Sequence, residues 1–436
     1  MSEPSTSGAD RNSLAARDAR RVLRPWRGGG APLAIARAEA ATVYDDRGRA
    51  YLDCTSGYFV NNAGHCHPRV IEAAKAQLEC VTQVSGRHVT EPAVALAERL
   101  VHRAPKTLDK VLFTTGGSEA TEFALKMARQ RACRPGVAAV EHGFHGLTLG
   151  ALAASSNAAY RATAGVPLGE HVVHLPSPYC YRCPYESRCA TQCLDEAERR
   201  LKARPHSLAA ILAEPMQAAG SIIPPTRWWK RLDAIRRRWG ALLILDEIQS
   251  GLGRTGRFFA CEHYGLEPDI LTAGKGISGG VGSLGAVLAS NEVSSSFDAG
   301  TTPTSAANAV SAAAGAALID ALCDEGLIDH AAAMGALARE LVEAIDDPWI
   351  GDIRLAGLFG GIELVLDRER RVALPRALVR AIKRGLQVRG VLITVSGPHA
   401  NVLRLQPPLC ITSGELEAFA DALRGALAEV RERGAA

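Results

Sequence analysis

Short runs of consecutive hydrophobic residues alternate with amphipathic stretches from about residue 69 to residue 290. A continuous apolar run of about four or five residues is typical of a strand buried on both faces, as in a parallel sheet. The intervening stretches, of which residues 118–129 are the clearest, carry an apolar face and are typical of crossover helices. We therefore predict an α/β sandwich with a mainly parallel sheet. The predicted strands are residues 111–113, 137–140, 209–213, 241–245 and 269–272.

The two ends of the chain show different patterns. Residues 1 to about 12 are polar and are predicted to be disordered, and a short helix over residues 13–23 precedes a hairpin over residues 41–53. From about residue 305 onward, helices and apolar strands alternate in a second α+β unit. Its predicted helices are residues 306–322, 337–345 and 415–430, and its predicted strands are residues 358–365 and 390–395.

The length of 436 residues exceeds what one hydrophobic core usually supports, so we predict two unequal domains. Residues 51–308 form the large domain and residues 309–436 the small one, which residues 1–50 join. Hydrophobic residues make up 47% of the chain and charged residues 22%, as in an ordinary soluble globular enzyme. The net charge of +4 is small and scattered, which argues against a nucleic-acid partner.

No apolar run reaches the roughly 18 residues that span a bilayer, and the first ten residues have no apolar core of a secretory signal. We therefore predict a cytoplasmic protein with no membrane partner. The chain contains 11 cysteines, an odd number dispersed along its length. That usage argues against a secreted disulfide framework.

Four of the cysteines form two pairs, Cys-x2-Cys and Cys-x3-Cys, with five residues between the pairs. The first spacing is typical of metal ligands, but the second pair follows it very closely. We favour four reduced cysteines in a surface loop and predict no metal. A small structural metal or redox site stays the alternative. The four residues are Cys180, Cys183, Cys189 and Cys193.

Polar residues follow five of the predicted strands at the point where each strand ends. Ligands of an open α/β sheet collect at the carboxyl ends of its strands, so these residues are candidates for a site. Any one of them could be an ordinary cap of a strand, but five in one sheet favour a shared function. They are Asp246 with Glu247, Glu214, the run from Glu141 to His145, Lys275, and the turn from Gly116 to Ser118.

Two of these strand ends indicate particular chemistry. The turn from Gly116 to Ser118 opens a helix whose free backbone amides and dipole suit a phosphate. Lys275 stands between two glycines after an apolar strand, which favours a buried and activated amine. The strand before Asp246 resembles the acidic strand of P-loop ATPases, but the chain has no Gly-x4-Gly-Lys-Ser/Thr motif. The Gly-x-Gly-x-x-Gly match at residues 251–256 does not directly follow its strand, so we interpret it as a turn.

Two long motifs include the predicted strand ends at Asp246 and Lys275. They are LDEIQSGLGRTG at residues 245–256 and PDILTAGKG at residues 268–276. Both resemble motifs of the class III (ω-type) aminotransferases, which are fold type I pyridoxal-phosphate enzymes. The similarity runs from about Tyr51 to the C-terminus and includes GHCHP at residues 64–68 and RLQPPL at residues 404–409. Such long motifs in the right order are highly specific. The resemblance implies the α/β fold of that group, with a large domain around a mainly parallel sheet and a smaller α+β domain.

The resemblance also implies roles for residues around the cofactor ring. Lys275 would hold pyridoxal 5'-phosphate as a Schiff base and would shuttle a proton between substrate and cofactor. Asp246 would pair with the pyridine nitrogen and keep it protonated, which makes the ring an electron sink. Phe144 would stack on the ring, and Gln249 would lie near its hydroxyl group.

Gly117 and Ser118 would bind the cofactor phosphate, and three further residues would lie on the substrate side. Arg404 matches the arginine that takes a substrate carboxylate through two parallel hydrogen bonds. The alternative for Arg404 is a structural ion pair with Glu214 or another acid. Glu214 would line the substrate side, and Tyr58 would shape the pocket.

The loop that ends at Asn308 resembles the Thr-x-x-x-Asn-Pro loop of the family. Aligned on that asparagine, Thr304 would be a phosphate ligand contributed by the neighbouring subunit. Ala309 replaces the usual proline, so Thr301 or Thr302 could serve instead. A loop that works across a subunit boundary implies a homodimer with its active site at the interface.

The expected function is transfer of an amino group from an amine or amino acid to a 2-oxo acid by a ping-pong mechanism. Residues 54–57 and 242–256 look close to 2,2-dialkylglycine decarboxylase, which carries a glutamine directly after its Thr-Ser-Gly. Tyr58 stands at that position here, which favours transamination over decarboxylation. A decarboxylating transaminase or a racemase on the same fold stays the alternative. The cysteine insert is also found in some 4-aminobutyrate aminotransferase-like members of the family.

Overall fold

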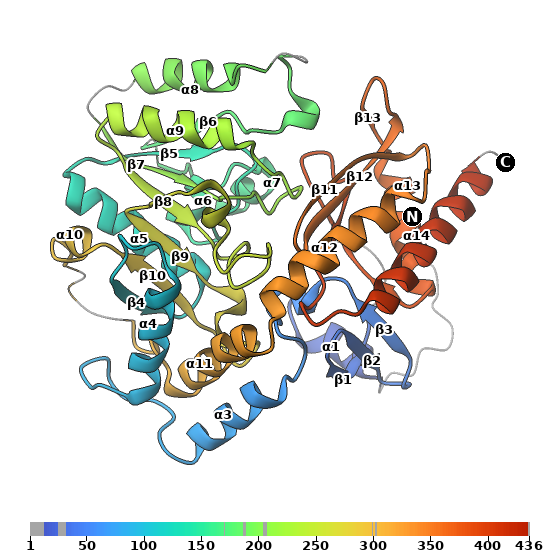
Figure 1. Cartoon of the computed structure of the whole chain (residues 1–436), viewed down its shortest axis with the longest axis horizontal. Helices are drawn as coiled ribbons and strands as arrows, with labels where there is room; N and C mark the ends of the chain where they lie inside the picture. The colour runs from blue at the N-terminus through green and yellow to red at the C-terminus, as the bar shows by residue number, and fades with distance from the viewer. Residues whose placement is uncertain are drawn as a thin grey trace.

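The computed structural model describes residues 13–24, 32–169, 171–185, 189–203, 207–298, 300 and 303–434. The disorder predicted for residues 1–12 lies outside the described residues. Figure 1 shows two lobes side by side, a larger one around a central sheet and a smaller one that holds the C-terminus. Helix α12 (Leu327–Glu343) runs between the two lobes.

Seven of the described strands form the central sheet. They are β4 (Lys110–Thr114), β5 (Gly136–Val140), β6 (Val172–Leu175), β7 (Leu208–Ala213), β8 (Leu242–Asp246), β9 (Ile270–Ala273) and β10 (Gly285–Ala289). Their order is β4-β10-β9-β8-β7-β5-β6. Only the pairs that involve β10 are antiparallel in this sheet, so β4 points the same way as the parallel strands. The mainly parallel sheet and all five predicted strands are confirmed, and β6 and β10 are additions.

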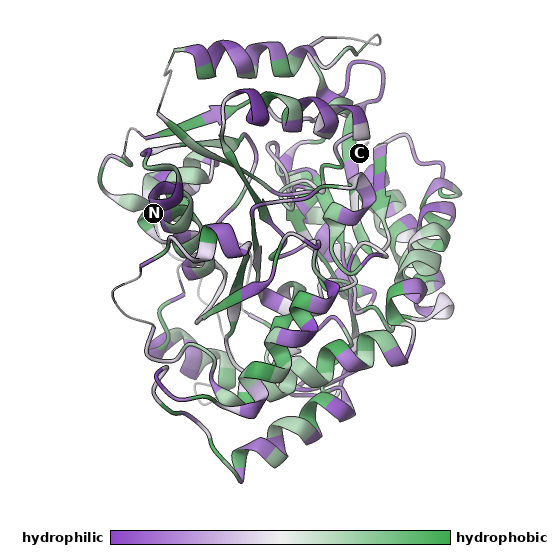
Figure 2. Cartoon of the chain, turned by 60° about the vertical axis from the view of Figure 1, so that its left-hand side comes forward, coloured by the Kyte–Doolittle hydropathy of each residue, from purple (hydrophilic) through white to green (hydrophobic). Residues whose placement is uncertain are grey.

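Both faces of the sheet are covered, which explains the continuous apolar runs. Strands β5, β7, β9 and β10 are buried along their whole length. Helix α5 (Gly117–Ala132) packs against β7, β9 and β10, α8 (Gln192–Lys202) against β6, and α9 (Thr226–Arg238) against β8. Figure 2 shows hydrophobic residues gathered on the strands and hydrophilic residues on the outer helices.

The remaining helices of the larger lobe lie around this core. Helix α11 begins at residue 309, three residues after the predicted start, because the side chain of Asn308 accepts hydrogen bonds from the amides of Val310 and Ser311. The helices are α3 (Pro68–Leu78), α4 (Glu91–Arg103), α6 (Leu149–Ala154), α7 (Ala158–Arg161), α10 (Asn291–Ser294) and α11 (Ala309–Asp324), with the short 3-10 helices η1 (Ala162–Ala164), η2 (Cys180–Arg182), η3 (Ala260–Tyr264) and η4 (Lys275–Ser278).

The N-terminal strands form a sheet with a strand from the far end of the chain. Its order is β1 (Ile35–Glu39), β2 (Thr42–Asp45), β3 (Ala50–Asp53) and β14 (Val391–Leu392), with β3 and β14 parallel. The predicted N-terminal helix is α1 (Leu14–Arg21), and β2 and β3 are the predicted hairpin. The division of the chain into domains at residues 50 and 308 stays a prediction.

The smaller lobe holds a five-stranded antiparallel sheet among the described residues. Its main order is β11 (Ile350–Ala356), β12 (Phe359–Asp367), β16 (Val402–Leu405) and β15 (Thr394–Ser396), and β13 (Val372–Ala373) pairs with β12. Helices α13 (Arg376–Val388) and α14 (Ser413–Gly434) pack against each other beside it. No helix among the described residues is long and apolar enough to cross a bilayer.

Two predicted elements of this lobe differ from the structure. The single strand predicted at residues 390–395 is divided between two sheets, because β14 pairs with β3 whereas β15 pairs with β16. The helix predicted at residues 337–345 is the second half of α12, which starts ten residues earlier. Gly335 lies inside that helix because the backbone of Gly357 leaves no room there for a Cβ atom.

Candidate active site

The predicted strand-end residues meet at one edge of the central sheet. Strands β4, β5, β7, β8 and β9 run in the same direction, so their carboxyl ends share that edge. Asp246 ends β8, Glu214 directly follows β7, and Lys275 follows β9 after one glycine. The charges of Asp246, Glu214 and Arg404 all act on the amine of Lys275, so these four residues lie close together.

Lys275 opens the 3-10 helix η4 with a left-handed backbone φ of 46°. A non-glycine residue in that region is held there by its surroundings. Burial lowers the pKa of its amine to about 8, although the negative charge of Asp246 acts in the opposite direction. Compared with the usual value of 10.5, this pKa gives on the order of a few hundred times more neutral amine near neutral pH. The neutral amine is the form that attacks a carbonyl carbon.

Asp246 is buried, with 3% of its surface exposed, and both of its carboxylate oxygens are engaged. Its Oδ2 lies 2.7 Å from Nδ1 of His145. Its Oδ1 accepts hydrogen bonds from the amide of Ile248 at 3.1 Å and from the hydroxyl of Thr272 at 3.3 Å. Burial by itself would lower the pKa of His145, but the hydrogen bond to Asp246 and the charge of that carboxylate outweigh it and raise the pKa.

Glu214 is a second buried carboxyl group at this edge. It accepts hydrogen bonds from the amide of Phe144 at 3.2 Å and from the amide of Ala218 at 2.9 Å. Burial raises its pKa to about 7, with a further rise from the charge of Asp246 and an opposing effect of His145. Burial therefore favours the neutral form of Glu214 more than that of an exposed carboxyl group.

The turn before α5 lies beside the segment that carries Lys275. A Cβ atom on Gly274 would stand 3.4 Å from the Cα of Gly117, and one on Gly117 would stand 3.0 Å from the side chain of Ile248. Glycine is needed at these positions because the backbones approach closely. The hydroxyl of Ser118 accepts a hydrogen bond of 3.2 Å from the amide of Leu147. The first turn of α5 thus opens toward the site with the partial positive charge of a helix N-terminus.

Arg404 lies in β16, and its guanidinium carbon is 4.0 Å from the centre of the Phe59 ring. The side chain is buried, and its Nε and Nη2 atoms have no hydrogen-bond partner among the described residues. Burial lowers its pKa to about 10, against the charges of Tyr58 and Glu214. The predicted alternative, an ion pair with Glu214 or another acid, does not occur in the part of the chain that the structure describes. A buried cation with free donors favours an anionic ligand, since an unpaired buried charge is costly.

The short helix α2 (Ser56–Phe59) is a left-handed turn, and the φ angles of its four residues lie between 42° and 75°. Left-handed helical geometry costs about 1–2 kcal/mol per residue other than glycine, so contacts must hold it. Asp53 accepts hydrogen bonds of 2.9 and 2.6 Å from two backbone amides of this segment. The turn presents the Phe59 ring to Arg404, and the Tyr58 side chain is 60% exposed.

The predicted phosphate residue Thr304 is exposed and lies in the loop before α11. Its carbonyl accepts a hydrogen bond of 3.0 Å from Gln83, whose side-chain oxygen accepts another of 3.0 Å from Asn308. These bonds tie the loop to the segment between α3 and α4. The predicted substitutes, Thr301 and Thr302, lie outside the described residues. The role of Thr304 stays a prediction.

The sequence profile of the family described as "Aminotransferase class-III" matches residues 27–427. The chain belongs to the class III aminotransferases. It is 35% identical to the adenosylmethionine-8-amino-7-oxononanoate aminotransferase of Nitratidesulfovibrio vulgaris, over 95% of this chain and 80% of that protein. It is 35% identical to the acetylornithine aminotransferase of Streptomyces coelicolor over 92% of each chain. It is 32% identical to the leucine/methionine racemase of Thermococcus litoralis, also over 92% of each.

Solved structures agree with this assignment. An (S)-enantioselective omega-transaminase from Thermomicrobium roseum is 31% identical, with a TM-score of 0.90 over 96% of this chain and 98% of that one. The omega transaminase from Pseudomonas jessenii in complex with PMP is 27% identical, with a TM-score of 0.91 over 96% and 98%. The predicted fold type I architecture and the predicted pyridoxal-phosphate cofactor are therefore confirmed for this aminotransferase.

The residues present in the aminotransferase fit this cofactor. An amine of lowered pKa, Lys275, stands beside the carboxylate of Asp246, and the start of α5 offers an anion site close to both. Gln249 donates a hydrogen bond of 2.9 Å to Oε1 of Gln406, and Nε2 of Gln406 is buried without a partner among the described residues. Unpaired buried donors at this edge suit a polar ligand.

Two features near the site were not predicted from the sequence, namely the position of Tyr160 and the contact that His145 makes. The ring of Tyr160, in α7, lies 5.5 Å from the ring of Phe144 in an edge-to-face contact. Burial raises the pKa of Tyr160, and the charges of Tyr58 and Arg404 also act on it. Tyr160 therefore lies near Phe144, Tyr58 and Arg404, where no sequence signal marked it. His145 stood in the list of strand-end residues, but its contact with Asp246 could not be foreseen.

The four clustered cysteines lie between β6 and α8 of the aminotransferase, two of them at the ends of the turn around η2 and two beside the start of α8. Burial raises the pKa of Cys193 to about 11, and the charges of the other three thiols add to the effect, so the four sulfur atoms are near one another. Among the described residues, however, no group of three or more His, Cys, Asp or Glu side chains is arranged to hold a metal ion.

We expect the purified aminotransferase to carry no stoichiometric metal at these cysteines. Elemental analysis should find neither zinc nor iron, and all four thiols should react with a thiol reagent after unfolding. Replacing the exposed Cys66, Cys80 and Cys133 with serine lowers the background of that titration. About one zinc or iron ion per chain or per dimer, lost when Cys180 and Cys183 are replaced, would establish the metal alternative.

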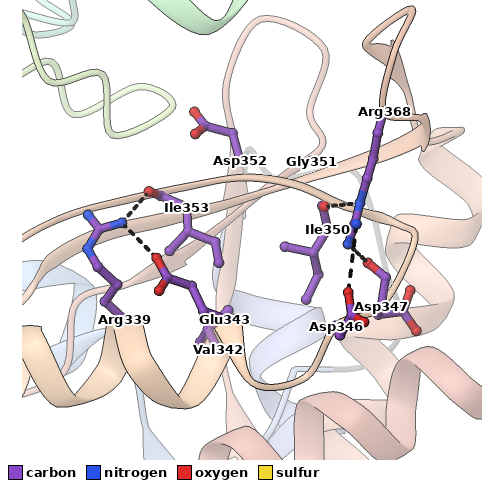
Figure 3. Close-up of a pocket in the computed structure, with 10 residues that line it drawn as sticks. All are labelled: Arg339, Val342, Glu343, Asp346, Asp347, Ile350, Gly351, Asp352, Ile353 and Arg368. Carbon is purple, nitrogen blue, oxygen red and sulfur yellow. Dashed lines mark hydrogen bonds and ion pairs between the residues drawn. The ribbon is translucent and has the colours of Figure 1, made fainter.

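A separate pocket of about 380 Å³ lies between α12 and β11, away from the strand ends. Figure 3 shows Arg339 and Arg368 bonded to nearby acidic side chains and backbone. Arg339 pairs with Glu343 and donates to the carbonyl of Ile353, and Arg368 donates to the carbonyl of Ile350. Its polar groups thus have partners within the protein, and nothing in the pocket indicates a ligand.

Proposed function

We propose that this aminotransferase moves an amino group from an amine or amino acid to a 2-oxo acid in two half-reactions, with Lys275 holding the cofactor. One observation carries the proposal: an amine whose pKa is lowered to about 8 stands within reach of the charges of Asp246 and Arg404. A nucleophilic amine, a buried carboxylate and an unpaired guanidinium are the three groups that amino transfer between carboxylate-bearing partners needs.

The cofactor is held by residues from several strand ends. When bound, pyridoxal phosphate accepts the amino group and withdraws electrons from the substrate carbon that carries it. Gly117 and Ser118 bind its phosphate at the start of α5, where backbone amides are free to donate. Phe144 would cover the ring, and Gln249 would lie near its hydroxyl group. Thr304 of a second subunit completes the phosphate site.

The chain's own side chains orient the substrate and move its protons. The neutral amine of Lys275 takes a proton from the substrate carbon and returns it, which its pKa of about 8 allows near neutral pH. Asp246 supplies a negative charge at the ring nitrogen. Arg404 donates from its free Nε and Nη2 atoms to the substrate carboxylate. Glu214 and Tyr58 line the substrate side.

Replacing Arg404 with alanine should raise the Michaelis constant for the 2-oxo acid far more than that for a donor amine without a carboxylate. Lost hydrogen bonds to a charged group of about 1.5–3 kcal/mol correspond to roughly a ten- to more than a hundred-fold rise. Steady-state kinetics with pyruvate or 2-oxoglutarate as acceptor, and with a simple amine as donor, measure both constants.

The donor amine serves as the control in this experiment, because it has no carboxylate for the guanidinium of Arg404 to bind. Arg404→Lys keeps the positive charge but loses the two-pronged geometry, so it should lie between the wild type and Arg404→Ala. Equal effects on acceptor and donor would mean that Arg404 is structural and that the carboxylate is bound elsewhere.

A racemase is the second candidate, because the leucine/methionine racemase of Thermococcus litoralis is 32% identical over 92% of this chain. Decarboxylation-dependent transamination is a third reaction of the same cofactor, disfavoured by Tyr58. A screen of amino donors with pyruvate or 2-oxoglutarate separates the three when keto product and carbon dioxide are both scored. Loss of optical activity from one amino acid without any oxo acid identifies a racemase.

The proposed assembly is a homodimer with the active site at its interface, supported by the exposed position of Thr304 in a loop that Gln83 holds in place. The proposed location is the cytoplasm, supported by the 11 cysteines, none of which forms a disulfide. The partners are small molecules, an amino donor and a 2-oxo acid.

A further inference from the structure

Arg404 and Gln406 project from the same face of strand β16. Alternate residues of a strand point to the same face. Leu403 and Leu405, on the other face, pack into the hydrophobic core. Gln406 directly follows the last residue of the strand and continues this alternation. The side chains of Arg404 and Gln406 are therefore neighbours on the face that is turned away from the core.

The backbone of Gln406 is fixed on both sides. Its amide donates a hydrogen bond of 2.9 Å to the carbonyl of Cys54, and its carbonyl accepts one of 3.0 Å from the hydroxyl of Ser56. These bonds tie Gln406 to the left-handed turn of α2, which presents the Phe59 ring to Arg404. Gln406 therefore has a fixed position relative to the guanidinium.

The side-chain amide of Gln406 has one group bonded and one group free. Its Oε1 accepts a hydrogen bond of 2.9 Å from Nε2 of Gln249. Its Nε2 is buried without a partner among the described residues, and the residue as a whole is 0% exposed. Buried amide donors in folded proteins nearly always have a partner, so this one indicates a ligand.

The free groups of Arg404 and Gln406 are all donors. They are Nε and Nη2 of the guanidinium and Nε2 of the amide. The contact with Phe59 covers only the flat side of the guanidinium, and its N–H groups lie in the plane, where they stay available. An ionised carboxylate only accepts hydrogen bonds, at about four positions. Two neighbouring residues with free donors therefore fit one carboxylate better than they fit an amine.

We propose that Gln406 is a second binding residue for the substrate carboxylate, which its Nε2 and the guanidinium of Arg404 hold together. The role rests on the proposed function, in which Arg404 binds that carboxylate. The bond from Gln249 to Oε1 fixes the orientation of the amide, so that its donor and not its acceptor is presented to the substrate.

The test begins with Gln406→Met, which keeps the length of the side chain but removes both polar groups. The first readout is the dissociation constant of propionate for the holoenzyme, measured from the absorption of the bound cofactor. Propionate has a carboxylate but neither a keto nor an amino group. The second readout is the pair of Michaelis constants for pyruvate and for isopropylamine, a donor without a carboxylate.

We expect Gln406→Met to weaken propionate binding and to raise the Michaelis constant for pyruvate by about ten-fold each, the effect of losing one hydrogen bond to a charged group. The constant for isopropylamine should stay unchanged. The matched control is Asn401→Ala, which alters a buried amide just before β16 that donates 2.6 Å to the carbonyl of Leu364. It should lower the stability but leave propionate binding unchanged.

Gln406→Glu is a second variant in case the methionine variant fails to fold. It retains an acceptor for Gln249 but has no N–H group, and it places a negative charge beside Arg404. We expect it to bind propionate about a hundred-fold more weakly, because it combines the lost bond with repulsion of a like charge. Unchanged propionate affinity in either folded variant would overturn the inference.

A double-mutant cycle separates a direct contact from an effect through Gln249. Gln406→Met should weaken propionate binding by about the same factor in a Gln249→Met background as in the wild type, since the two contacts are independent. No further weakening in that background would mean that Gln406 acts only through Gln249, and would overturn the inference.

Arg404→Ala separates this inference from the proposed function. Weaker propionate binding in Arg404→Ala with normal binding in the Gln406 variants would remove only the role of Gln406. Normal propionate binding in Arg404→Ala would remove the carboxylate anchor of the proposed function and the role of Gln406 with it.

Discussion

Replacing Lys275 with alanine should abolish turnover and leave the fold intact. The variant loses the only side chain at this edge of the described sheet that can attack the cofactor carbonyl as a neutral amine near neutral pH. The purified wild-type protein should be yellow, and borohydride should fix the cofactor to Lys275. Peptide mapping by mass spectrometry locates the adduct, and an adduct on another lysine would refute the assignment.

The fold should survive because the lysine does not stabilise it. Its pKa is about 8 in the folded chain and 10.5 in the unfolded one, so folding disfavours the protonated form. As the pH falls from 10.5 to about 8, the unfolded chain binds a proton that the folded chain does not, so the free energy of unfolding decreases. Below that range the decrease from this group is complete. Cofactor-free Lys275→Ala should therefore be at least as stable as the cofactor-free wild type at neutral pH, as thermal unfolding can measure.

Lys383 is a matched control for this experiment. It is a partly buried lysine whose pKa is also lowered by burial, but it lies in α13 of the smaller lobe. Lys383→Ala should keep its colour and its turnover. Loss of activity in both variants would point to a general effect of removing a buried amine, not to chemistry at Lys275.

The sheet and its strand ends could be predicted because both depend on local pattern. Continuous apolar runs such as residues 209–213 and 241–245 have to be buried on both faces, and polar residues directly after them then gather at one edge. Asp246, Glu214 and Lys275 follow from that reasoning alone. The antiparallel strand β10 does not, because its apolar run resembles the others and its direction depends on the chain path.

The predictions were weaker where long-range contacts decide the structure. The run at residues 390–395 carries one apolar pattern but serves two sheets, since β3 and β16 take different halves of it. The left-handed turn of α2 depends on Asp53, which lies before it, and on contacts with the far end of the chain. The contact of His145 with Asp246 joins residues 101 positions apart, so no spacing rule could have indicated it.

The substrate side was the least predictable part of the site. Arg404 was placed there by resemblance, and the absence of any ion partner among the described residues is a structural finding. Tyr160 belongs to a short helix without a motif, and only the fold brings it to Phe144. The residues that face a substrate depend on the shape of that substrate, and the hydrophobic pattern of the chain carries no information about it.

Asp246→Asn should slow removal of the substrate Cα proton by about a hundred- to a thousand-fold, the scale of losing one group aimed at developing charge. Asparagine has nearly the same shape and can keep the contacts with His145 and Thr272, so the fold should be retained. It carries no charge, however, and cannot hold the ring nitrogen in its protonated form, so the ring withdraws electrons less strongly. The exchange of the Cα hydrogen of an amino acid with deuterated water measures this step directly, apart from product release.

The matched control is Asp269→Asn at the opposite end of the neighbouring strand. Asp269 accepts hydrogen bonds from the amide of Leu243 at 2.8 Å and from Arg236 at 3.0 Å, so its role lies in the sheet and not at the site. Asp269→Asn should lower the stability of the protein but leave the exchange rate of the folded enzyme unchanged. Asp246→Asn should retain the fold but lower the exchange rate. Near-normal exchange in Asp246→Asn would mean that another group sets the charge of the ring nitrogen. If Asp246 has the proposed role, the exchange rate cannot stay unchanged, because Asp246 is the only carboxylate directly bonded to His145 in the described part of the site.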